Sequence, residues 1–354
     1  MICITTYNTN ITFNILEHQV YKFGLFLVDK IMHDAGNSLM NLQDIPHFTG
    51  DWDDIVGNHL VAEQLDYDQL IELERASLYI SKLNTCQKQV HDLILNSVQA
   101  KDSEGRQQGS LFFVNGPGGM GKLFTWNTLA HSCRGRGLIV LCVASSGIAA
   151  IIIGGTTAHN MFKIPIQVHE HSICAIKRGS ERAHLLQKTS LIIWDEIPMQ
   201  HHHLIEVVDR TCRDMLQCSH LPFGGITVAF GGDFQQTLPV VPRGNKEEII
   251  GACIQRSPLW HHVNVLHLTK NMRIDPHDPQ STWFENWLYD IGQGNQLPLD
   301  HSLTDPQQMV CQPELSNLIP LTYPALQHGL EMSNGFFLEN AILCPINTEV
   351  DDIN

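Results

Sequence analysis

Five short apolar runs, each about the length of a strand, recur along the chain between residues 110 and 270. They cover residues 111–115, 138–144, 191–195, 226–231 and 263–268. Helix-length segments separate most of these runs. Continuous apolar strands that alternate with helices predict a parallel sheet covered by helices on both faces, which is an α/β fold.

The two ends of the chain have a different pattern. Residues 25–32 have the spacing of an amphipathic helix that ends near Gly36, and a second helix is predicted over residues 67–83. A last strand is predicted at residues 341–344. We therefore expect three parts: a partly helical N-terminal extension over residues 1–80, a central α/β domain over 81–280, and a linker with the incomplete start of a second α/β domain over 281–354.

A glycine-rich turn follows the first predicted strand. It consists of Gly116, Pro117, Gly118, Gly119, Met120, Gly121 and Lys122. Glycines in a strand-to-helix turn let backbone N–H groups curve around phosphate oxygens, and the N-terminus of the next helix adds its positive dipole. Gly116, Gly121 and Lys122 have the spacing of a phosphate loop, in which the lysine reaches the β- and γ-phosphates. The turn predicts ATP binding, and a chance glycine-rich turn is the alternative.

Position 123 departs from the phosphate-loop pattern. A Ser or Thr hydroxyl normally follows the lysine and binds Mg²⁺, whereas Leu123 has no oxygen. Thr125 lies two residues further on, roughly 200° around a helix, so it is not expected to replace that hydroxyl. We therefore expect Mg²⁺ to be held mainly by Asp195 and the phosphates, and ATP hydrolysis to be slow.

Two acidic residues, Asp195 and Glu196, end the third apolar run. In open α/β sheets, ligands lie at the carboxyl ends of the strands. Asp195 is suited to hold Mg²⁺, and Glu196 is suited to polarise the water that attacks the γ-phosphate. Incidental acids at a strand end are the alternative, and the phosphate loop earlier in the chain weakens it.

Two further candidates follow the fourth and fifth runs. Asp233 and Gln236 lie at another predicted strand end, where they can sense the γ-phosphate. Arg273 could stabilise the charge of the transition state in the manner of an arginine finger. For Arg273 alone, an ordinary surface arginine is an equal alternative.

Composition narrows the class of protein. The chain has 354 residues, a formal charge of −15 and a pI near 5.7, which argues against a generic basic nucleic-acid coat. Its ten cysteines include no C-x-x-C pair, which favours a reducing compartment over a disulfide framework or a zinc site. No signal peptide is apparent, and small polar residues interrupt the apolar stretch 138–153, which predicts a strand followed by a helix and no membrane span.

Eight motifs occur in one order and carry a family resemblance. They are LNTCQ at 83–87, GPGGMGK at 116–122, ASSGIAA at 144–150, TTAHNMFKIP at 156–165, WDEIPM at 194–199, PFGG at 222–225, GGDFQQTLP at 231–239 and LTKNMR at 268–273. Together they resemble a Pif-type superfamily-one DNA helicase, in the form found in eukaryotic genomes and in Helitron mobile elements. The resemblance covers roughly residues 80–290 and implies a RecA-like P-loop fold.

The resemblance also implies roles for individual residues. Gln87 would read the adenine, Gln236 would sense the γ-phosphate, and Arg273 would act in trans across a domain cleft. Lys122 would hold phosphates, Asp195 the metal and Glu196 the hydrolytic water. The residues implied to touch single-stranded DNA are Ser145, Ser146, Gly147, Thr157, His159 and Phe162. Small polar residues and one aromatic ring suit a sugar–phosphate backbone and a stacked base, although both segments could also be ordinary helix starts.

The activity implied is an ATP-dependent DNA helicase that moves 5′ to 3′ on single-stranded DNA. Its partners would be single-stranded and duplex DNA, with no membrane, and the chain would be a monomer in the nucleus with roles in DNA repair, recombination and telomere maintenance. Besides Leu123, the family's alanine after the acidic pair is Ile197, and the later motifs of a second RecA-like domain do not follow Asn354. From this we expect the polypeptide alone not to unwind duplex DNA. The alternatives are an impaired nucleotide- or DNA-binding remnant of a Helitron-type element, and a different P-loop motor.

Two other features are expected to have no functional role. Three adjacent histidines, His201, His202 and His203, are not expected to face one metal, and no acid or cysteine has a suitable spacing to join them. The aromatic residues of 283–288 are expected to form a helix stripe that packs in a core rather than a platform for bases.

Overall fold

The computed structural model describes residues 58–101, 103, 105–274 and 277–295, together with shorter stretches nearer the two ends (24–26, 28–29, 31–33, 36–42, 315–324, 336, 340–344 and 346–353). The chain divides into two compact units, Met1–Glu285 and Asn286–Asn354. The sheet and the candidate site lie in the first unit. The prediction that residues 1–80 form a separate extension remains a prediction.

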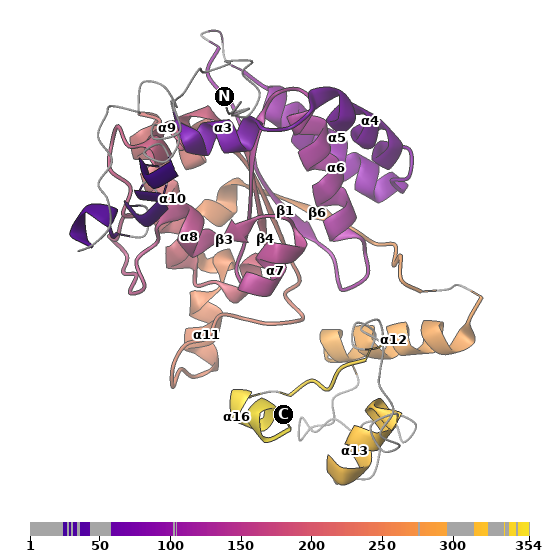
Figure 1. Ribbon diagram of the computed structural model, residues 1–354. Helices are drawn as coiled ribbons and strands as arrows, with labels where there is room; N and C mark the ends of the chain where they lie inside the picture. Colours follow the sequence, from indigo (N-terminus) through magenta and orange to yellow (C-terminus); the bar gives the residue numbers. More distant parts are fainter. Residues whose placement is uncertain are drawn as a thin grey trace, which may run out of the picture. The chain divides into compact units, whose positions relative to one another are not determined.

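One parallel sheet forms the centre of the first unit (Figure 1). Among the described residues it has six strands in the order β3-β2-β4-β5-β1-β6, and every pairing is parallel. The strands are β1 (Leu111–Asn115), β2 (Ile139–Ala144), β3 (Thr156–Thr157), β4 (Thr189–Asp195), β5 (Thr227–Gly232) and β6 (Val263–His267). The five strands predicted from apolar runs are confirmed, with boundaries shifted by at most two residues.

Helices cover both faces of this sheet, because alternate side chains of each buried strand enter two separate cores. Leu111 and Phe113 of β1 pack in one core, whereas Phe112 and Val114 pack in the other. The second core contains side chains of α5 (Thr85–Gln99), α6 (Lys122–Arg134) and α7 (Gly147–Ile152). The first contains side chains of α3 (His59–Leu65), α8 (Ala158–Phe162), α9 (Glu181–Lys188) and α10 (His202–Met215). In Figure 1, α5 and α6 lie on one side of the strands and α9 and α10 on the other.

The remaining elements of the two units are helices. They are η1 (Leu39–Asn41), α4 (Gln69–Ile80), η2 (Ile197–Met199), η3 (Pro222–Gly225), α11 (Lys246–Ala252), η4 (Ile254–Arg256), η5 (Pro258–His262), α12 (Pro279–Gln293), α13 (Leu315–Thr322) and α16 (Asn347–Ile353). Helix α4 confirms the helix predicted over residues 67–83, and the Asp68 carboxylate caps its first turn. The described residues of 24–33 are helical, and Gly36 follows with a φ of +81°, as predicted for the first helix.

Strand β3 is the strand that the apolar pattern did not reveal. It consists of two threonines and pairs with Val143 and Ala144 at the end of β2. The chain reaches this position through Gly155, where a Cβ atom would lie 2.0 Å from the backbone oxygen of Cys142. A glycine is therefore needed for the close approach, but so short a strand has no periodicity to detect.

Two predictions near the C-terminal end need correction. Residues 341–344 have no regular secondary structure, so the strand predicted there is wrong. A strand needs a hydrogen-bonded neighbour, and no strand occurs among the described residues of the second unit. Helix α16 follows this segment. Helix α12 also forms, but none of its described residues is buried, and Trp283 and Phe284 are exposed, so the predicted core stripe is not seen. Of the residues described, no helix has the length and apolar character needed to cross a membrane.

Candidate nucleotide-binding site

The residues predicted to bind phosphate and metal lie at the carboxyl ends of three neighbouring strands. Strand β5 lies between β4 and β1 in the sheet, and all three strands run in the same direction. The glycine-rich loop leaves β1, Asp195 ends β4, and Asp233 follows β5. Because the carboxyl ends of parallel strands meet at one edge, the fold brings these three segments together.

The loop after β1 depends on glycines at two positions. Gly119 and Gly121 have φ values of +89° and +78°, which non-glycine residues rarely adopt. A Cβ atom on Gly119 would lie 2.5 Å from the Asn271 Oδ1 atom, and one on Gly121 would lie 2.4 Å from the Gln87 Nε2 atom. The loop therefore has the backbone curvature that a phosphate cradle requires, and the two neighbouring side chains leave no room for a Cβ atom at these positions.

Lys122 begins helix α6 directly after this loop. Its ammonium group donates to the backbone oxygen of Gly116 and lies 3.5 Å from that of Pro117. The positive charge is therefore held across the loop itself, at the N-terminus of a 13-residue helix. This is the position from which a lysine can move onto phosphate oxygens, and that role remains a prediction.

The two residues next to Lys122 that bear on metal binding are Leu123 and Thr125. Leu123 is 36% exposed and offers no oxygen. Thr125 is fully buried, and its hydroxyl donates to the backbone oxygen of Gly121 at 3.1 Å. The Thr125 hydroxyl is therefore occupied by the helix backbone and does not replace the oxygen that position 123 lacks.

The acidic pair at the end of β4 has two distinct environments. Asp195 is buried, and its Oδ1 atom accepts a hydrogen bond from the indole N–H of Trp126 at 3.2 Å. Its backbone oxygen accepts from the N–H of Ser145. Glu196 is half-buried and has a φ of +54°, a left-handed conformation that turns the chain away from the strand. The pair therefore offers one fixed carboxylate and one carboxylate on a strained turn.

Burial raises the pKa of Glu196, and the negative charges of Asp195 and Asp233 raise it further, whereas the Lys122 ammonium opposes them. The charges of Asp195, Asp233 and Lys122 are therefore close enough to act on the Glu196 carboxyl group. A glutamate with a raised pKa is a stronger base when ionised, which suits the polarisation of water.

Asp233 and the segment 271–273 complete the surroundings of the loop. Asp233 is buried and accepts hydrogen bonds from the Gln235 N–H and the Gln236 Nε2 atom, both at 3.0 Å. Gln236 itself is exposed. The Met272 N–H donates to the Gly119 backbone oxygen at 2.8 Å, so the segment that carries Arg273 is attached to the phosphate loop. Arg273 is exposed, which is expected both for an arginine finger and for an ordinary surface arginine, so its exposure does not separate these two alternatives.

Gln87 lies against the phosphate loop and is shielded from solvent. It is almost fully buried, and its Nε2 atom donates to the Met120 backbone oxygen at 3.2 Å. Its Oε1 atom accepts from the Asn84 N–H in a capping box that starts α5. The side chain therefore braces the phosphate loop against α5, a role that the sequence did not suggest. Contact with adenine remains a prediction.

The residues predicted to touch DNA lie in the segments at the carboxyl ends of β2 and β3 and in the following helices α7 and α8, and β2 is the neighbour of β4 in the sheet. Ser146 and Thr157 cap the short helices α7 and α8, and Gly147 is exposed. The Ser145 hydroxyl donates to the backbone oxygen of Asp195 at 3.3 Å, which links this segment to the acidic pair. His159 is half-buried, and burial lowers its pKa.

Phe162 requires a correction. Its side chain is fully buried and stacks on Trp194 with ring centroids 5.6 Å apart. It therefore belongs to the core on one face of the sheet, and its ring is not available to stack on a base. An aromatic residue within a motif looks the same in sequence whether it faces solvent or the core.

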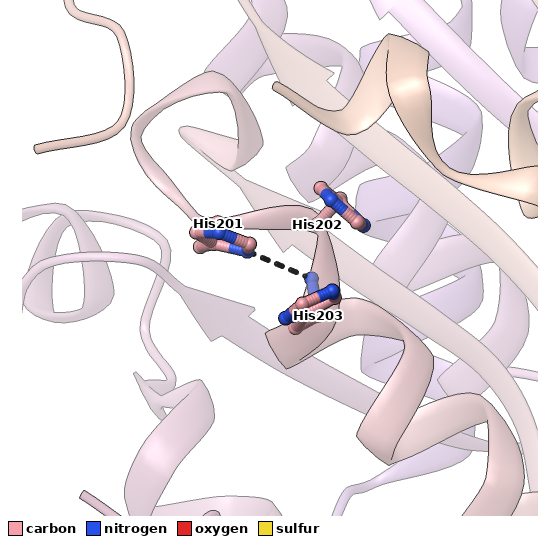
Figure 2. A group of neighbouring side chains, drawn as sticks. All are labelled: His201, His202 and His203. Atoms are coloured by element: carbon pink, nitrogen blue, oxygen red, sulfur yellow. Dashed lines mark hydrogen bonds between the residues drawn. The ribbon is translucent and has the colours of Figure 1, made fainter. Parts of the chain in front are cut away.

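The three adjacent histidines also differ from expectation (Figure 2). One possible ligand atom from each of His201, His202 and His203 lies within 4.8 Å of the others, and an acid is present because the His202 Nδ1 atom lies 2.8 Å from a Glu206 oxygen. However, the His201 Nδ1 atom accepts the His203 N–H at 3.1 Å and thereby caps α10. The positive end of the α10 dipole disfavours a cation, so the contacts favour a capping role over a metal site.

The raised pKa of Glu196 gives a testable dependence of stability on pH. Because the folded protein binds the Glu196 proton more tightly than the unfolded chain does, this residue's contribution to stability falls as pH rises from the ordinary glutamate value through the raised one. Glu196→Gln is therefore expected to melt at a higher temperature than wild type at pH 8 and to lose this advantage at pH 4. The exposed Glu74 in the middle of α4 gives a control, Glu74→Gln, that should melt as wild type does at both values. A lower melting temperature for Glu196→Gln at pH 8 would contradict this assignment.

Comparison with known proteins places this geometry in a family. The PIF1-like helicase family matches residues 82–301. An ATP-dependent DNA helicase Pif1 from Psychrobacter is 37% identical over 167 residues, which is 47% of this chain and 25% of that protein. An ATP-dependent DNA helicase PIF1 from Candida albicans is 32% identical over 161 residues, which is 44% of this chain and 17% of that protein. The chain thus aligns with a quarter or less of these relatives.

Solved structures agree with the sequence matches. A structure of two coordinating Pif1 helicases at forked double-stranded DNA superposes on 62% of this chain and 50% of its own, with a TM-score of 0.50 and 27% identity. The crystal structure of Pif1 helicase from Candida albicans covers 70% of this chain and 55% of its own, with a TM-score of 0.51 and 25% identity. The parallel sheet with helices on both faces is therefore the RecA-like arrangement that the sequence predicted. Because the family match covers more than half of the chain, the chain belongs to the PIF1-like helicase family.

Proposed function

We propose that this chain is the ATP-hydrolysing part of a DNA helicase that moves 5′ to 3′ along single-stranded DNA. The observation that carries the proposal is the convergence of the phosphate loop, the Asp195–Glu196 pair and Asp233 at one edge of strands β4, β5 and β1. Family membership supplies the substrate class. On the same basis we propose a nuclear monomer with roles in DNA repair, recombination and telomere maintenance.

In this proposal, the loop of residues 116–121 surrounds the phosphates of ATP and Lys122 contacts the β- and γ-phosphates. Glu196 polarises the attacking water, for which it must be ionised. Gln236, which is tied to Asp233, reports the presence of the γ-phosphate, and Arg273 acts on a phosphate from a neighbouring domain. Catalysis of phosphoryl transfer consists mainly of positioning the reactants and stabilising charge, and these groups can supply both.

The donor set around the loop fits Mg²⁺ in part. Hard divalent cations prefer oxygen ligands, and Asp195 supplies a carboxylate beside two other acids, Glu196 and Asp233. Leu123 supplies none, so Asp195 would be the main protein ligand. The cation would neutralise charge on the phosphate oxygens. We expect binding to depend on Asp195 more strongly than in a loop with a hydroxyl at position 123.

Coupling to a DNA strand has a direct test in the rate of ATP hydrolysis. We expect phosphate release by the wild-type chain to be faster with a single-stranded oligonucleotide than without it. The reason is that Ser145, in the segment after β2 that is predicted to touch DNA, donates hydrogen bonds to the backbone oxygen of Asp195. Stimulation should decline with added salt, since phosphate contacts release counterions. The control is a blunt duplex of the same sequence, which should stimulate less. Equal rates with and without single strand would contradict the proposed coupling.

A further inference from the structure

The indole ring of Trp126 reaches from helix α6 to the acidic pair. Trp126 lies four residues after Lys122, one helical turn further along, and is 1% exposed. Its N–H donates to the Asp195 Oδ1 atom at 3.2 Å. Among the described residues, this is the one hydrogen bond to the Asp195 carboxylate. The helix that follows the phosphate loop therefore also sets the position of the carboxylate on β4.

Strand β5 leaves room for this contact. A Cβ atom on Gly231 would lie 2.4 Å from the Asp195 Oδ1 atom and 2.7 Å from the Trp126 Cζ2 atom. No side chain other than the hydrogen of glycine is compatible with both distances unless the ring or the carboxylate moves. The Trp126 ring and the Asp195 carboxylate therefore meet in the space that Gly231 leaves beside β5.

The chemistry of the contact is directional. An indole N–H only donates, so the Asp195 Oδ1 atom accepts this bond and is held in a fixed direction. The second oxygen of Asp195 stays available for a cation. Orientation of this carboxylate matters more here than in most phosphate-loop proteins, because Leu123 removes the hydroxyl that would share the metal.

We propose that Trp126 is a positioning residue for the metal-binding carboxylate: its indole N–H orients Asp195 and so sustains divalent-cation binding in a site that has lost the hydroxyl at position 123. This inference rests on the proposed nucleotide site. Trp126 would act as the residues do that orient metal ligands by hydrogen bonds in other proteins.

Trp194 provides a comparison within the same protein. It directly precedes Asp195 and is fully buried, yet its indole N–H has no hydrogen-bond partner among the described residues. Replacing each tryptophan with phenylalanine removes similar volume from the core. Only the change at Trp126 removes a hydrogen bond to Asp195, which separates positioning from packing.

The experiment measures Mn²⁺ binding by electron paramagnetic resonance on the full chain saturated with ADP, alongside ADP binding in EDTA by calorimetry. We expect Trp126→Phe to weaken Mn²⁺ binding by about tenfold or more, with metal-free ADP binding unchanged. Trp194→Phe should bind Mn²⁺ as wild type does. Adding Leu123→Thr to Trp126→Phe should restore Mn²⁺ affinity, because it returns an oxygen ligand to the loop.

A second variant guards against loss of fold. Replacing Trp126 with 3-benzothienylalanine keeps the ring shape and exchanges only the N–H for sulfur, and it should weaken Mn²⁺ binding as Trp126→Phe does. Wild-type Mn²⁺ affinity in both Trp126 variants would overturn the proposal, as would an equal loss in Trp194→Phe. A wild-type protein that binds ADP but holds Mn²⁺ no better than ADP alone would overturn the proposed metal site itself, which is a distinguishable failure.

Discussion

Glu196→Gln is expected to lower the rate of ATP hydrolysis by about 10²- to 10⁴-fold, which is the usual contribution of a positioned general base. Glutamine keeps the size of the side chain but cannot accept a proton, so the polarisation of water is lost. Binding of ATP should stay close to wild type or become slightly tighter, since one negative charge near the phosphates is removed. Steady-state phosphate release and calorimetric binding of an ATP analogue give the two values.

The matched control is Glu247→Gln on helix α11, which removes an exposed carboxylate. It should hydrolyse ATP at the wild-type rate. Retention of wild-type hydrolysis by Glu196→Gln would show that another group activates the water, with Asp233 the next acid to examine because it shares the same edge of the sheet.

The second large effect is expected for Lys122→Ala. Hydrogen bonds to charged groups contribute about 1.5–3 kcal/mol, so loss of the ammonium should weaken ATP binding by roughly 10- to 150-fold. The change also removes the contacts of the lysine with Gly116 and Pro117 across the loop. A melting curve should therefore accompany the titration to show that the fold persists.

Lys188→Ala at the end of α9 is the control for this change, because it removes an exposed ammonium outside the glycine-rich loop. Its affinity for ATP should equal that of wild type. If Lys122→Ala binds ATP with unchanged affinity, the loop of residues 116–121 is not the phosphate site, whatever its family resemblance.

The parts of the fold that could be predicted from sequence share a local cause. Strands such as 191–195 are continuous apolar runs because both faces of the sheet are covered, so they stand out without knowledge of their neighbours. The phosphate loop could also be recognised, because a positive φ at Gly119 and Gly121 restricts those positions to glycine. In both cases the constraint acts within a few residues of the chain.

The features that were missed depend on partners distant in sequence. The bond from Trp126 to Asp195 joins residues 69 apart, and it exists only because β5 places Gly231 beside them. Phe162 was assigned to DNA because its partner Trp194 cannot be inferred from the motif around it. The apolar residues 341–344 illustrate the converse, since a strand-like pattern forms no strand without a neighbour to pair with.

The histidines at 201–203 show a limit of spacing rules. Three adjacent histidines were not expected to face one metal, and no acid was expected at a suitable spacing to join them. His201 is not in the helix but caps it, with an extended backbone, and this brings its ring next to those of His202 and His203. The backbone geometry at a helix start therefore brings together side chains that their positions in the sequence did not predict to meet.

A crystal structure of the chain with Mg²⁺ and a non-hydrolysable ATP analogue tests the central claim most directly. The account predicts β- and γ-phosphates within hydrogen-bond distance of the backbone N–H groups of residues 118–122, with the Lys122 ammonium moved from the Gly116 oxygen onto the phosphates. It also predicts the cation beside the Asp195 carboxylate, which still accepts the Trp126 N–H. A nucleotide bound elsewhere, with Lys122 still on Gly116, would contradict it.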